Sequence, residues 1–315
     1  MLDPTPLADN VPAVRRLLRD ALQATATPGE SPEEGLPMLD GLVTSGASLG
    51  RLFLEGKEPV GLALWEPPTP VGLFVHVLYL EPGRARPERY RIALAAIEAA
   101  AGPVSFVLRR LAGLPRESEA ALMSSLGFAS YGRSEMRYTG SRDPPAFPLP
   151  AGVVLRRPRD DDGERLARLH QAAYAGGLDR YLFLADPDPA RDSERSIAEV
   201  IGGRHGPFLP SVSVVAAAAD SAVVGACLVV RAGHGPLIVD VMVEPSRRRA
   251  GLARAMVADS VRALRAAGET SVALNVTEGN VPAVRTYETV GFVRSIGPQW
   301  SWYSRARLPV EAGRG

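Results

Sequence analysis

The chain lacks several features that mark special classes of protein. It has a single cysteine, Cys227, so an intrachain disulfide is excluded and a reducing cytoplasm is expected. Its longest apolar runs, such as residues 212–219, stop far short of the roughly 20 residues that a membrane helix needs. The first residues, MLDPTPLADN, have no basic segment followed by an apolar one, so no signal peptide is expected. These absences predict a cytoplasmic protein without a membrane partner.

An excess of either charge is also missing. The 36 basic and 35 acidic side chains leave a net charge of +1, and Lys57 is the only lysine. A balanced chain has no overall attraction for nucleic acid, so none is expected as a partner. The length of 315 residues and the hydrophobic content of 46% are those of an ordinary globular protein of about two domains.

A proline-rich stretch divides the chain into two parts. Residues 140–152, GSRDPPAFPLPAG, contain four prolines and two glycines, which resist helix and strand alike. We therefore expect a linker at 140–152 between a first domain, residues 1–139, and a second, residues 153–309.

The two parts repeat short sequence patterns in the same order. Three pairs match at offsets of 164, 163 and 164 residues, which favours an internal duplication over chance. The pairs are Val60-Gly61 with Val224-Gly225, Glu81-Pro82 with Glu244-Pro245, and Gly127-Phe128 with Gly291-Phe292.

The hydrophobic pattern of the second part predicts an α+β domain. Its largely antiparallel, mixed sheet is expected to carry helices on both faces, and the duplication predicts two such domains in tandem. The expected strands are 153–157, 211–219, 222–231, 236–243, 271–276 and 299–305, and the expected helices are 161–175, 251–267 and 281–290, with a loop and helix region over 176–203.

Three arginines run into small residues at the start of the helix expected from 251. The stretch SRRRAGLARAM covers residues 246–256. A helix N-terminus prefers acidic residues, so this crowding of positive charge indicates an anion bound in the turn. Free main-chain N–H groups at a helix start bind phosphate, and Gly251 and Ala253 leave room for it. By itself the turn leaves another interpretation open, in which Gly251 only caps the helix and the arginines are surface charge.

Two motifs, in order, resemble those of the GNAT superfamily of acetyl-CoA-dependent N-acetyltransferases. V-x-V-x-P followed by R-x-x-G-x-A (Arg248, Gly251, Ala253) is similar to its pyrophosphate-binding motif. Residues 280–292, NVPAVRTYETVGF, are similar to its second motif, N-x-x-A-x-x-x-Y-x-x-x-G-F. The resemblance covers residues 153–305 and, through the duplication, more weakly 50–138. It is a resemblance to tandem-domain members of the superfamily.

The resemblance implies acetyl-CoA as cosubstrate, no metal, and direct attack of a neutral primary amine on the thioester. The strand at 241–243 would leave its neighbour and bind the pantetheine arm, and Tyr287 would protonate the departing thiolate. A phenol with a pKa near 10 suits that proton transfer, although a lone tyrosine on such a helix is more commonly a core residue. The cofactor contacts so implied are Val241, Met242, Val243, Arg248, Arg249, Ala250, Gly251, Leu252, Ala253, Arg254, Asn280, Ala283 and Tyr287.

The first copy departs from both motifs. Bulky or charged residues replace the small ones, and methionine replaces the tyrosine, so we expect a degenerate domain with a scaffolding or substrate-enclosing role. Arg248, Gly251, Ala253, Asn280 and Tyr287 correspond to Ala85, Glu88, Tyr90, Arg116 and Met123.

The base that deprotonates the amine is left open by the sequence. Asp240, on the strand before the cofactor edge, is the first candidate, although a structural role is at least as common. Glu278, beside the second motif, is another candidate, with capping of the next helix as the plainer interpretation. His170, His205 and His234 have suitable ordinary pKa values, but single histidines without a partner are usually unremarkable.

The acceptor is expected to be a small-molecule amine, bound by residues 174–186 and by Trp300, Trp302 and Tyr303, although these aromatic residues are more commonly core. Two alternatives stay open: a protein N-terminus or lysine as acceptor, and a non-catalytic acyl-CoA-binding or regulatory protein. Tyr287 argues against the second. The acceptor, the acyl length and the oligomeric state do not follow from the sequence.

Overall fold

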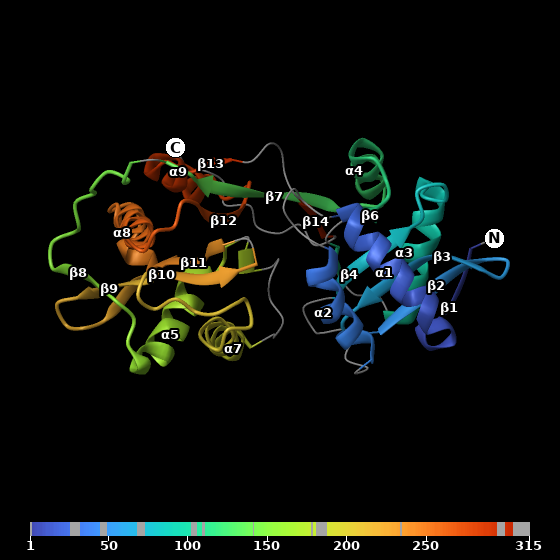
Figure 1. Cartoon of the computed structure of the whole chain (residues 1–315), viewed down its shortest axis with the longest axis horizontal. Coiled ribbons are helices and arrows are strands. Elements are labelled where there is room, and N and C mark those ends of the chain that lie inside the picture. Colours follow the sequence, from blue (N-terminus) through green and yellow to red (C-terminus); the bar gives the residue numbers. More distant parts are fainter. Residues whose placement is uncertain are drawn as a thin grey trace. The chain divides into compact units, whose positions relative to one another are not determined.

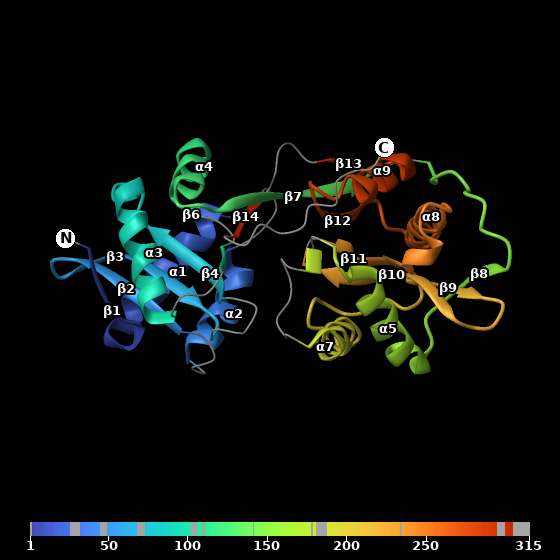
Figure 2. The ribbon, with the colours of Figure 1, turned by 180° about the vertical axis from the view of Figure 1, so that it is seen from behind.

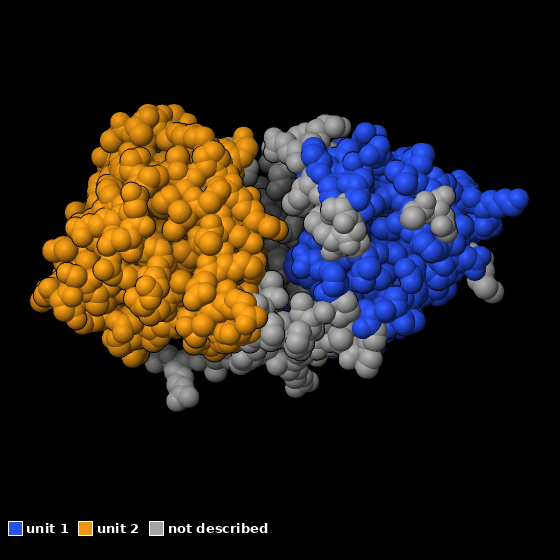
Figure 3. Space-filling view, turned by 90° about the horizontal axis from the view of Figure 1, so that it is seen from below, with its two compact units in different colours: residues 1–132, 300–308 blue, residues 133–299, 309–315 orange. Residues whose placement is uncertain are grey.

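A computed structural model of the chain (Figure 1) describes residues 2–25, 32–44, 49–67, 73–101, 106–108, 111–140, 142–177, 179–180, 188–233, 235–294 and 300–304. The chain forms two compact units (Figure 3). Unit 1 contains residues 1–132 and 300–308, and unit 2 contains residues 133–299 and 309–315. In the described part of the chain, no helix is long and apolar enough to cross a bilayer.

Unit 1 is a mixed sheet in the order β1–β2–β3–β4–β5–β14. The first four strands are antiparallel, β5 is parallel to β4, and β14 is antiparallel to β5. The strands are β1 (Leu2–Pro6), β2 (Leu49–Glu55), β3 (Glu58–Trp65), β4 (Leu73–Leu80), β5 (Phe106–Leu108), β6 (Leu111–Ala112) and β14 (Trp300–Ser304), and the helices are α1 (Val11–Thr25), α2 (Pro32–Thr44), α3 (Pro87–Ala101) and α4 (Arg116–Ser125), with a 3-10 turn η1 (Leu7–Asn10) before α1.

Alternation along the strands of unit 1 sends successive side chains to opposite faces of its sheet. Leu62 and Leu64 of β3 pack with α1 in one apolar cluster. Ala63 and Trp65 of the same strand pack with α3 in another. The sheet is therefore covered by α1 on one face and by α3 on the other.

Unit 2 repeats this plan with the order β8–β9–β10–β11–β12–β7. Only β11 and β12 are parallel. The strands are β7 (Ala129–Tyr138), β8 (Val153–Arg156), β9 (Val214–Ala218), β10 (Val223–Ala232), β11 (Gly235–Val243), β12 (Val272–Thr277) and β13 (Val293–Arg294), and the helices are α5 (Gly163–Tyr174), α7 (Pro189–Ile201), α8 (Leu252–Ala266) and α9 (Val281–Val290), with 3-10 turns η2 (Asp160–Asp162) and η3 (Pro245–Arg247).

The faces of this second sheet are also divided between two pairs of helices. Ala226, Leu228 and Val230 of β10 pack with α5 and α7. Cys227 and Val229 of the same strand pack with α8 and α9. Figure 2, seen from behind, shows α5 and α7 on one side of β10 and β11 and α8 and α9 on the other. The expected tandem α+β architecture is confirmed, with β13 as a short strand that the sequence pattern did not reveal.

The units exchange strands, which the sequence did not indicate. Residues 133–138 of β7 pair with β12 of unit 2, and Tyr303 of β14 pairs with Leu108 of β5 in unit 1. The division between compact units therefore falls after Gly132, not at the expected boundary of 139. Most of the expected linker, 140–152, has no helix or strand where it is described, and Asp143 is bound to Arg265 of α8 at 2.7 Å.

Candidate active site

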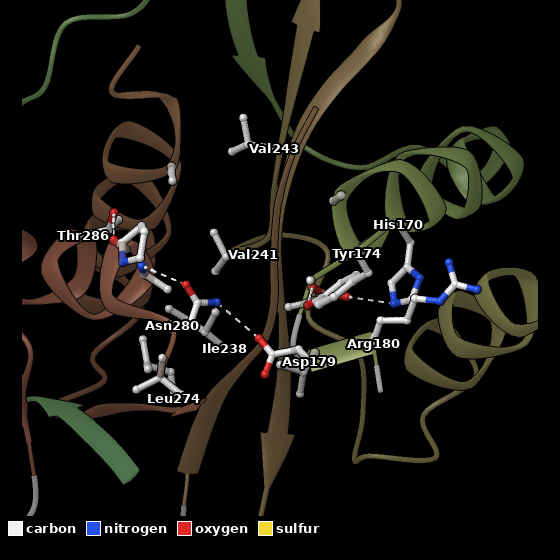
Figure 4. A pocket seen from close by; sticks show the side chains of 18 of the residues that line it. His170, Tyr174, Asp179, Arg180, Ile238, Val241, Val243, Leu274, Asn280 and Thr286 are labelled. Atoms are coloured by element: carbon white, nitrogen blue, oxygen red, sulfur yellow. Dashed lines mark hydrogen bonds and ion pairs between the residues drawn. The ribbon is translucent and has the colours of Figure 1, made fainter. Parts of the chain in front are cut away.

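A cavity of about 1060 Å³ lies in unit 2. It is lined by the C-terminal halves of β11 and β12, by α5 and α7, by the turn at 245–254 and by the first turns of α9 (Figure 4). The cavity wall thus includes residues of both sequence motifs. The described residues that line it all belong to unit 2.

The separation of β11 from β12 opens this cavity. The two strands pair only at Leu237 with Ala273 and at Ile238 with Leu274, although β11 continues to Val243. Val239 is an extra residue in the register with β10, where Leu228 faces Asp240 and Val229 faces Ile238. Such a bulge bends a strand and ends its pairing. The bulge therefore comes directly after the last residue that β11 shares with β12.

Beyond the bulge, β11 has one free edge. Residues 240–243 pair with β10, but no described residue pairs with them on the other side. Val241 and Val243 are half-buried and line the cavity, whereas the Met242 side chain is fully buried against α5 and α7. A free strand edge offers main-chain N–H and C=O groups to an extended ligand. Met242 can contribute only its main chain.

The turn after β11 holds its main chain in an unusual conformation. Arg249 has φ +65° and Gly251 has φ +81°, and a non-glycine residue with positive φ is uncommon. No acceptor among the described residues bonds the N–H groups of residues 249–253. Alternating right- and left-handed residues of this kind form a concave group of N–H donors that binds anions. A Cβ on Gly251 would lie 3.2 Å from Nη2 of Arg254.

Two arginines of the turn are held by other parts of unit 2. Nη2 of Arg248 donates to the main-chain oxygen of Ala173, at the end of α5. The Arg254 guanidinium lies 5.5 Å from the ring centre of Phe147, in the expected linker. Arg248 and Arg254 still line the cavity, together with Arg249, so positive charge surrounds the free N–H groups.

Asn280 is engaged at both ends of its amide. Its Oδ1 accepts from the N–H of Ala283 at 3.2 Å and so caps α9, and its Nδ2 donates to Oδ2 of Asp179 at 3.2 Å. Asp179 also accepts from the Thr277 hydroxyl and lies 3.8 Å from Nη1 of Arg133. Asn280 therefore ties the start of α9 to the segment after α5. Asp179 lies within the range 174–186 expected to contact the acceptor, but nothing in the sequence singled it out as a partner of Asn280.

The Tyr287 ring packs in the core of unit 2, and the residue also lines the cavity. Its ring lies 6.1 Å from that of Phe292, and the residue is 9% exposed. Burial raises the pKa of its phenol above the ordinary value, and nearby Cys227, Asp179 and Asp240 act in the same direction. The phenol therefore keeps its proton across the physiological range.

Asp240 presents a buried carboxylate, 8% exposed, beside the bulge. The Tyr174 hydroxyl donates to Oδ1 at 2.7 Å, and Nε2 of His170 lies 3.8 Å from Oδ2. Burial raises the pKa of Asp240; Asp179 acts in the same direction, and His170 and Tyr174 act against it. A carboxylate with a raised pKa is a stronger base than an exposed one.

Several expected roles lie elsewhere. Glu278 does not cap α9, because Asn280 does; instead Glu278 accepts from the Ser134 hydroxyl at 2.6 Å. The Tyr303 hydroxyl donates to Glu119 at 2.6 Å inside unit 1, so this aromatic residue belongs to a core. His205 lines the cavity but is half-exposed, with its Nε2 4.0 Å from Glu199. His234, the side chains of Trp300 and Trp302, and residues 181–186 lie outside the described residues.

His170 and Tyr174 were the residues that sequence reasoning undervalued. They are four apart on α5 and therefore share one face of that helix. Their rings lie 4.6 Å apart. The i, i+4 spacing of two polar aromatic residues was the available signal. It could not name Asp240 as their common partner, because α5 and β11 are 66 residues apart at this contact.

In unit 1 the corresponding strand edge is closed. After its pairing with β5, β4 pairs with β6 at Leu78 and Tyr79. The buried Tyr90 hydroxyl then accepts from the N–H of Leu80 at 3.2 Å. Tyr90 corresponds in sequence to Ala253, and with its large side chain it takes up a main-chain N–H at the end of β4.

Comparisons with known proteins agree with this geometry. The Acetyltransferase (GNAT) family matches residues 179–292. A mycothiol acetyltransferase of Thermomonospora curvata is 28% identical over 291 residues, covering 90% of this chain and 91% of that protein.

Two solved structures share the fold over the whole chain. A GCN5-related N-acetyltransferase of Sphaerobacter thermophilus has a TM-score of 0.65 at 21% identity, covering 96% of this chain and 94% of its own. A tandem GNAT protein of the clavulanic acid biosynthesis pathway has a TM-score of 0.62 at 17% identity, covering 96% and 97%. The resemblance to tandem GNAT proteins is confirmed.

We expect the Asp240→Asn variant to melt at the same temperature as the parent, or higher, at pH 7. The folded-state pKa of Asp240 is raised, so the folded protein binds more protons than the unfolded chain between the two pKa values. The contribution of Asp240 to the free energy of unfolding therefore falls as pH rises through that window. Asparagine removes the buried charge and still accepts from Tyr174. Thermal melts at pH 7 and pH 4 should show the difference shrinking at the lower pH.

The matched control is Asp162→Asn. Burial opposes its ionisation, but hydrogen bonds from Arg156 and from the N–H of Arg159 lower the pKa of Asp162, so this variant should lose stability at pH 7. A clear loss of stability in Asp240→Asn at pH 7 would contradict the inference that the ionised Asp240 carboxylate lowers the free energy of unfolding.

Proposed function

Because the second half of this chain is a GNAT N-acetyltransferase domain, we propose that it transfers the acetyl group of acetyl-CoA to the primary amine of a small molecule, and that only unit 2 does so. The observation that carries the proposal is the free edge of β11 leading into the N–H groups of residues 249–253. An extended arm ending in a diphosphate matches that sequence of donors.

The residues present fit acetyl-CoA. The main chain of Val241, Met242 and Val243 would bind the pantetheine arm along the open edge. The N–H groups of 249–253, with the charge of the surrounding arginines, would hold the pyrophosphate. Gly251 leaves space that a Cβ would narrow. Asn280 would support cofactor binding by capping α9, and Ala283 would leave room for the cofactor because its side chain in the cavity wall is small.

Acetyl-CoA supplies an acetyl thioester, which a neutral amine attacks directly. The residues of this chain manage the protons. The acceptor enters as an ammonium ion, and the Asp240 carboxylate takes a proton from it. Tyr287 donates its phenolic proton to the departing thiolate. Burial keeps that phenol protonated beforehand and strengthens Asp240 as a base. Tyr174 fixes the carboxylate by its hydrogen bond.

The acceptor end of the cavity supports a small polar amine. One face of α7 turns a run of polar side chains to the cavity, and Arg180 lines it without an ion pair to any described residue. The polar residues on that face are Asp192, Ser193, Ser196 and Glu199. The relative named mycothiol acetyltransferase makes cysteinyl sugars a sensible first acceptor to test. A non-catalytic role would not need Asp240 and Tyr287 in one cavity.

The experiment is a panel of acceptors with purified protein, measuring CoA release and the acetylated product. It includes amino acids, polyamines, aminoglycosides, cysteinyl sugars and peptides. Transfer to one small amine would support the proposal. Transfer to peptides alone would favour a protein N-terminus or lysine as acceptor, and binding of acetyl-CoA without any transfer would favour the non-catalytic alternative.

We predict one acetyl-CoA per chain. Unit 2 has the open edge, whereas β6 and Tyr90 close that of unit 1. Isothermal titration calorimetry of the full chain should give a stoichiometry of one. Two equivalent sites would contradict the difference between the units.

We expect Gly251→Glu to abolish acetyl-CoA binding while the protein stays folded. The side chain adds bulk and negative charge where the diphosphate would lie, at a backbone φ that costs about 1 kcal/mol or more outside glycine. The matched control is Gly268→Glu, at the other end of α8. Gly268 has φ +90° and open space around its Cβ position, so the strain is similar but the cavity is untouched. Equal affinity in the two variants would show that the turn is not the site.

Tyr287→Phe should lower kcat by about 10²–10⁴, the usual contribution of a general acid. Acetyl-CoA affinity should change little, because the ring packing against Phe292 survives. Tyr138→Phe is the control: its ring also contacts Phe292, and it lies outside the cavity wall. Met123→Tyr in unit 1 should create no second activity. A Tyr287→Phe enzyme that turns over at the parental rate would mean that another group supplies the proton.

A further inference from the structure

Four side chains from three elements meet at the acceptor end of the cavity. His170 and Tyr174 come from α5, Ser193 from α7 and Asp240 from β11. Figure 4 shows His170 and Tyr174 side by side on the wall opposite Asn280. The proposed transfer uses only Asp240 and the hydrogen bond from Tyr174, so His170 has no role in it so far.

His170 is held in one orientation. Its Nδ1 lies 2.9 Å from the hydroxyl of the buried Ser193, and its ring packs in a tilted arrangement against that of Tyr174, with the ring centres 4.6 Å apart. The side chain is 15% exposed, and Nε2 is the nitrogen that faces Asp240. An imidazole fixed at one nitrogen offers the other for proton transfer.

Asp240 and His170 leave a gap of a defined size. The Tyr174 hydroxyl already bonds Oδ1 of Asp240, so Oδ2 is the oxygen left facing His170. The distance of 3.8 Å from Oδ2 to Nε2 is too long for a direct hydrogen bond, which needs about 2.7–3.2 Å. A single nitrogen placed beside both atoms can donate one N–H to each. A primary ammonium ion has three N–H donors and satisfies this arrangement.

The charges around the gap favour a cation in it. Besides Asp240 and His170, the charged and titratable side chains that line the cavity include Tyr174 from α5, Tyr287 from α9, Asp179 and Arg180 from the segment after α5, Asp192, Arg195 and Glu199 from α7, and Arg133 from β7. Asp192 binds Arg195 at 2.7 Å, and Asp179 lies 3.8 Å from Arg133 of β7. Asp179 and Asp192 are thus each matched by a cation, as Glu199 is by Arg195 at 3.0 Å, and among the described acids that line the cavity Asp240 is the one without an arginine.

The proton that Asp240 takes from the ammonium ion needs a route to solvent. When an ammonium ion becomes an amide, its nitrogen loses two protons while one N–C bond forms and one S–C bond breaks. The departing thiolate takes up one proton, so one more must reach solvent in each turnover. Asp240 is buried, whereas His170 lies next to it and is partly exposed.

From this geometry we infer that His170 and Asp240 together bind the ammonium group of the acceptor, and that His170 accepts the proton that leaves to solvent. The inference rests on the proposed acetyl transfer. It makes His170 a catalytic residue and requires the acceptor to carry a protonated primary amine. Tyr174 and Ser193 are positioning residues, which hold Asp240 and His170 in place.

The first test compares His170→Ala with His170→Gln and with the control His76→Gln. His76 lies in unit 1, 3.0 Å from Glu66. We expect His170→Ala to lose about 10²-fold or more in kcat, as removal of a proton acceptor does, with acetyl-CoA affinity unchanged. Added imidazole should restore part of the rate in a saturable way, and should not stimulate the parent. The pH profile of kcat should also change shape in both His170 variants and stay parental in His76→Gln.

A parental rate and pH profile in His170→Ala would overturn the inference while leaving acetyl transfer established. A slow variant that imidazole does not rescue, with an unchanged pH profile, would reduce His170 to a structural role and would also overturn it.

The second test does not depend on activity. The ring signals of His170, assigned by comparison with His170→Gln, are followed by NMR during titration with methylammonium chloride. We expect a saturable shift in the parent and in the control His76→Gln, and none in Asp240→Asn. Absence of the shift in the parent would contradict the ammonium site. A shift without transfer to any amine would instead count against the proposed function alone.

Discussion

The site depends on one local break in the sheet, the bulge at Val239 that ends the pairing of β11 with β12 after Ile238. Two consequences follow from this single extra residue. The main chain from Asp240 to Val243 keeps β10 on one side and gains a free edge on the other. Asp240 is set beside α5, where Tyr174 and His170 reach its two oxygens. The proposed cofactor edge and the proposed base are therefore positioned by the same irregularity.

In unit 1 the corresponding strand edge is occupied by another strand of the same unit. Strand β4 pairs with β6, and Tyr90 satisfies the N–H of Leu80 with its hydroxyl. Tyr90 is buried in the core of unit 1, so the same side chain satisfies this N–H and contributes to packing. Both features agree with the scaffolding role proposed for unit 1.

Local sequence patterns predicted most of the architecture and part of the site. The positive φ of Gly251 and the α9 cap at Asn280 follow from residue types at fixed positions, and the two motifs marked both. The exchange of β7 and β14 could not be predicted, because a strand's own alternation does not name its partner. The same holds for His170 and Asp179, whose partners lie on elements far along the chain. No periodic pattern linked either residue to its partner, so only the fold could connect His170 with Asp240 and Asp179 with Asn280.

Hydrogen–deuterium exchange with and without acetyl-CoA tests the central claim most directly, since it reads main-chain N–H groups in both units at once. The account predicts slower exchange over residues 240–254 on addition of acetyl-CoA and no change over the corresponding residues 77–91 of unit 1. Unchanged exchange at 240–254 under saturating acetyl-CoA, or equal protection in both units, would contradict a cofactor bound along the open edge of β11.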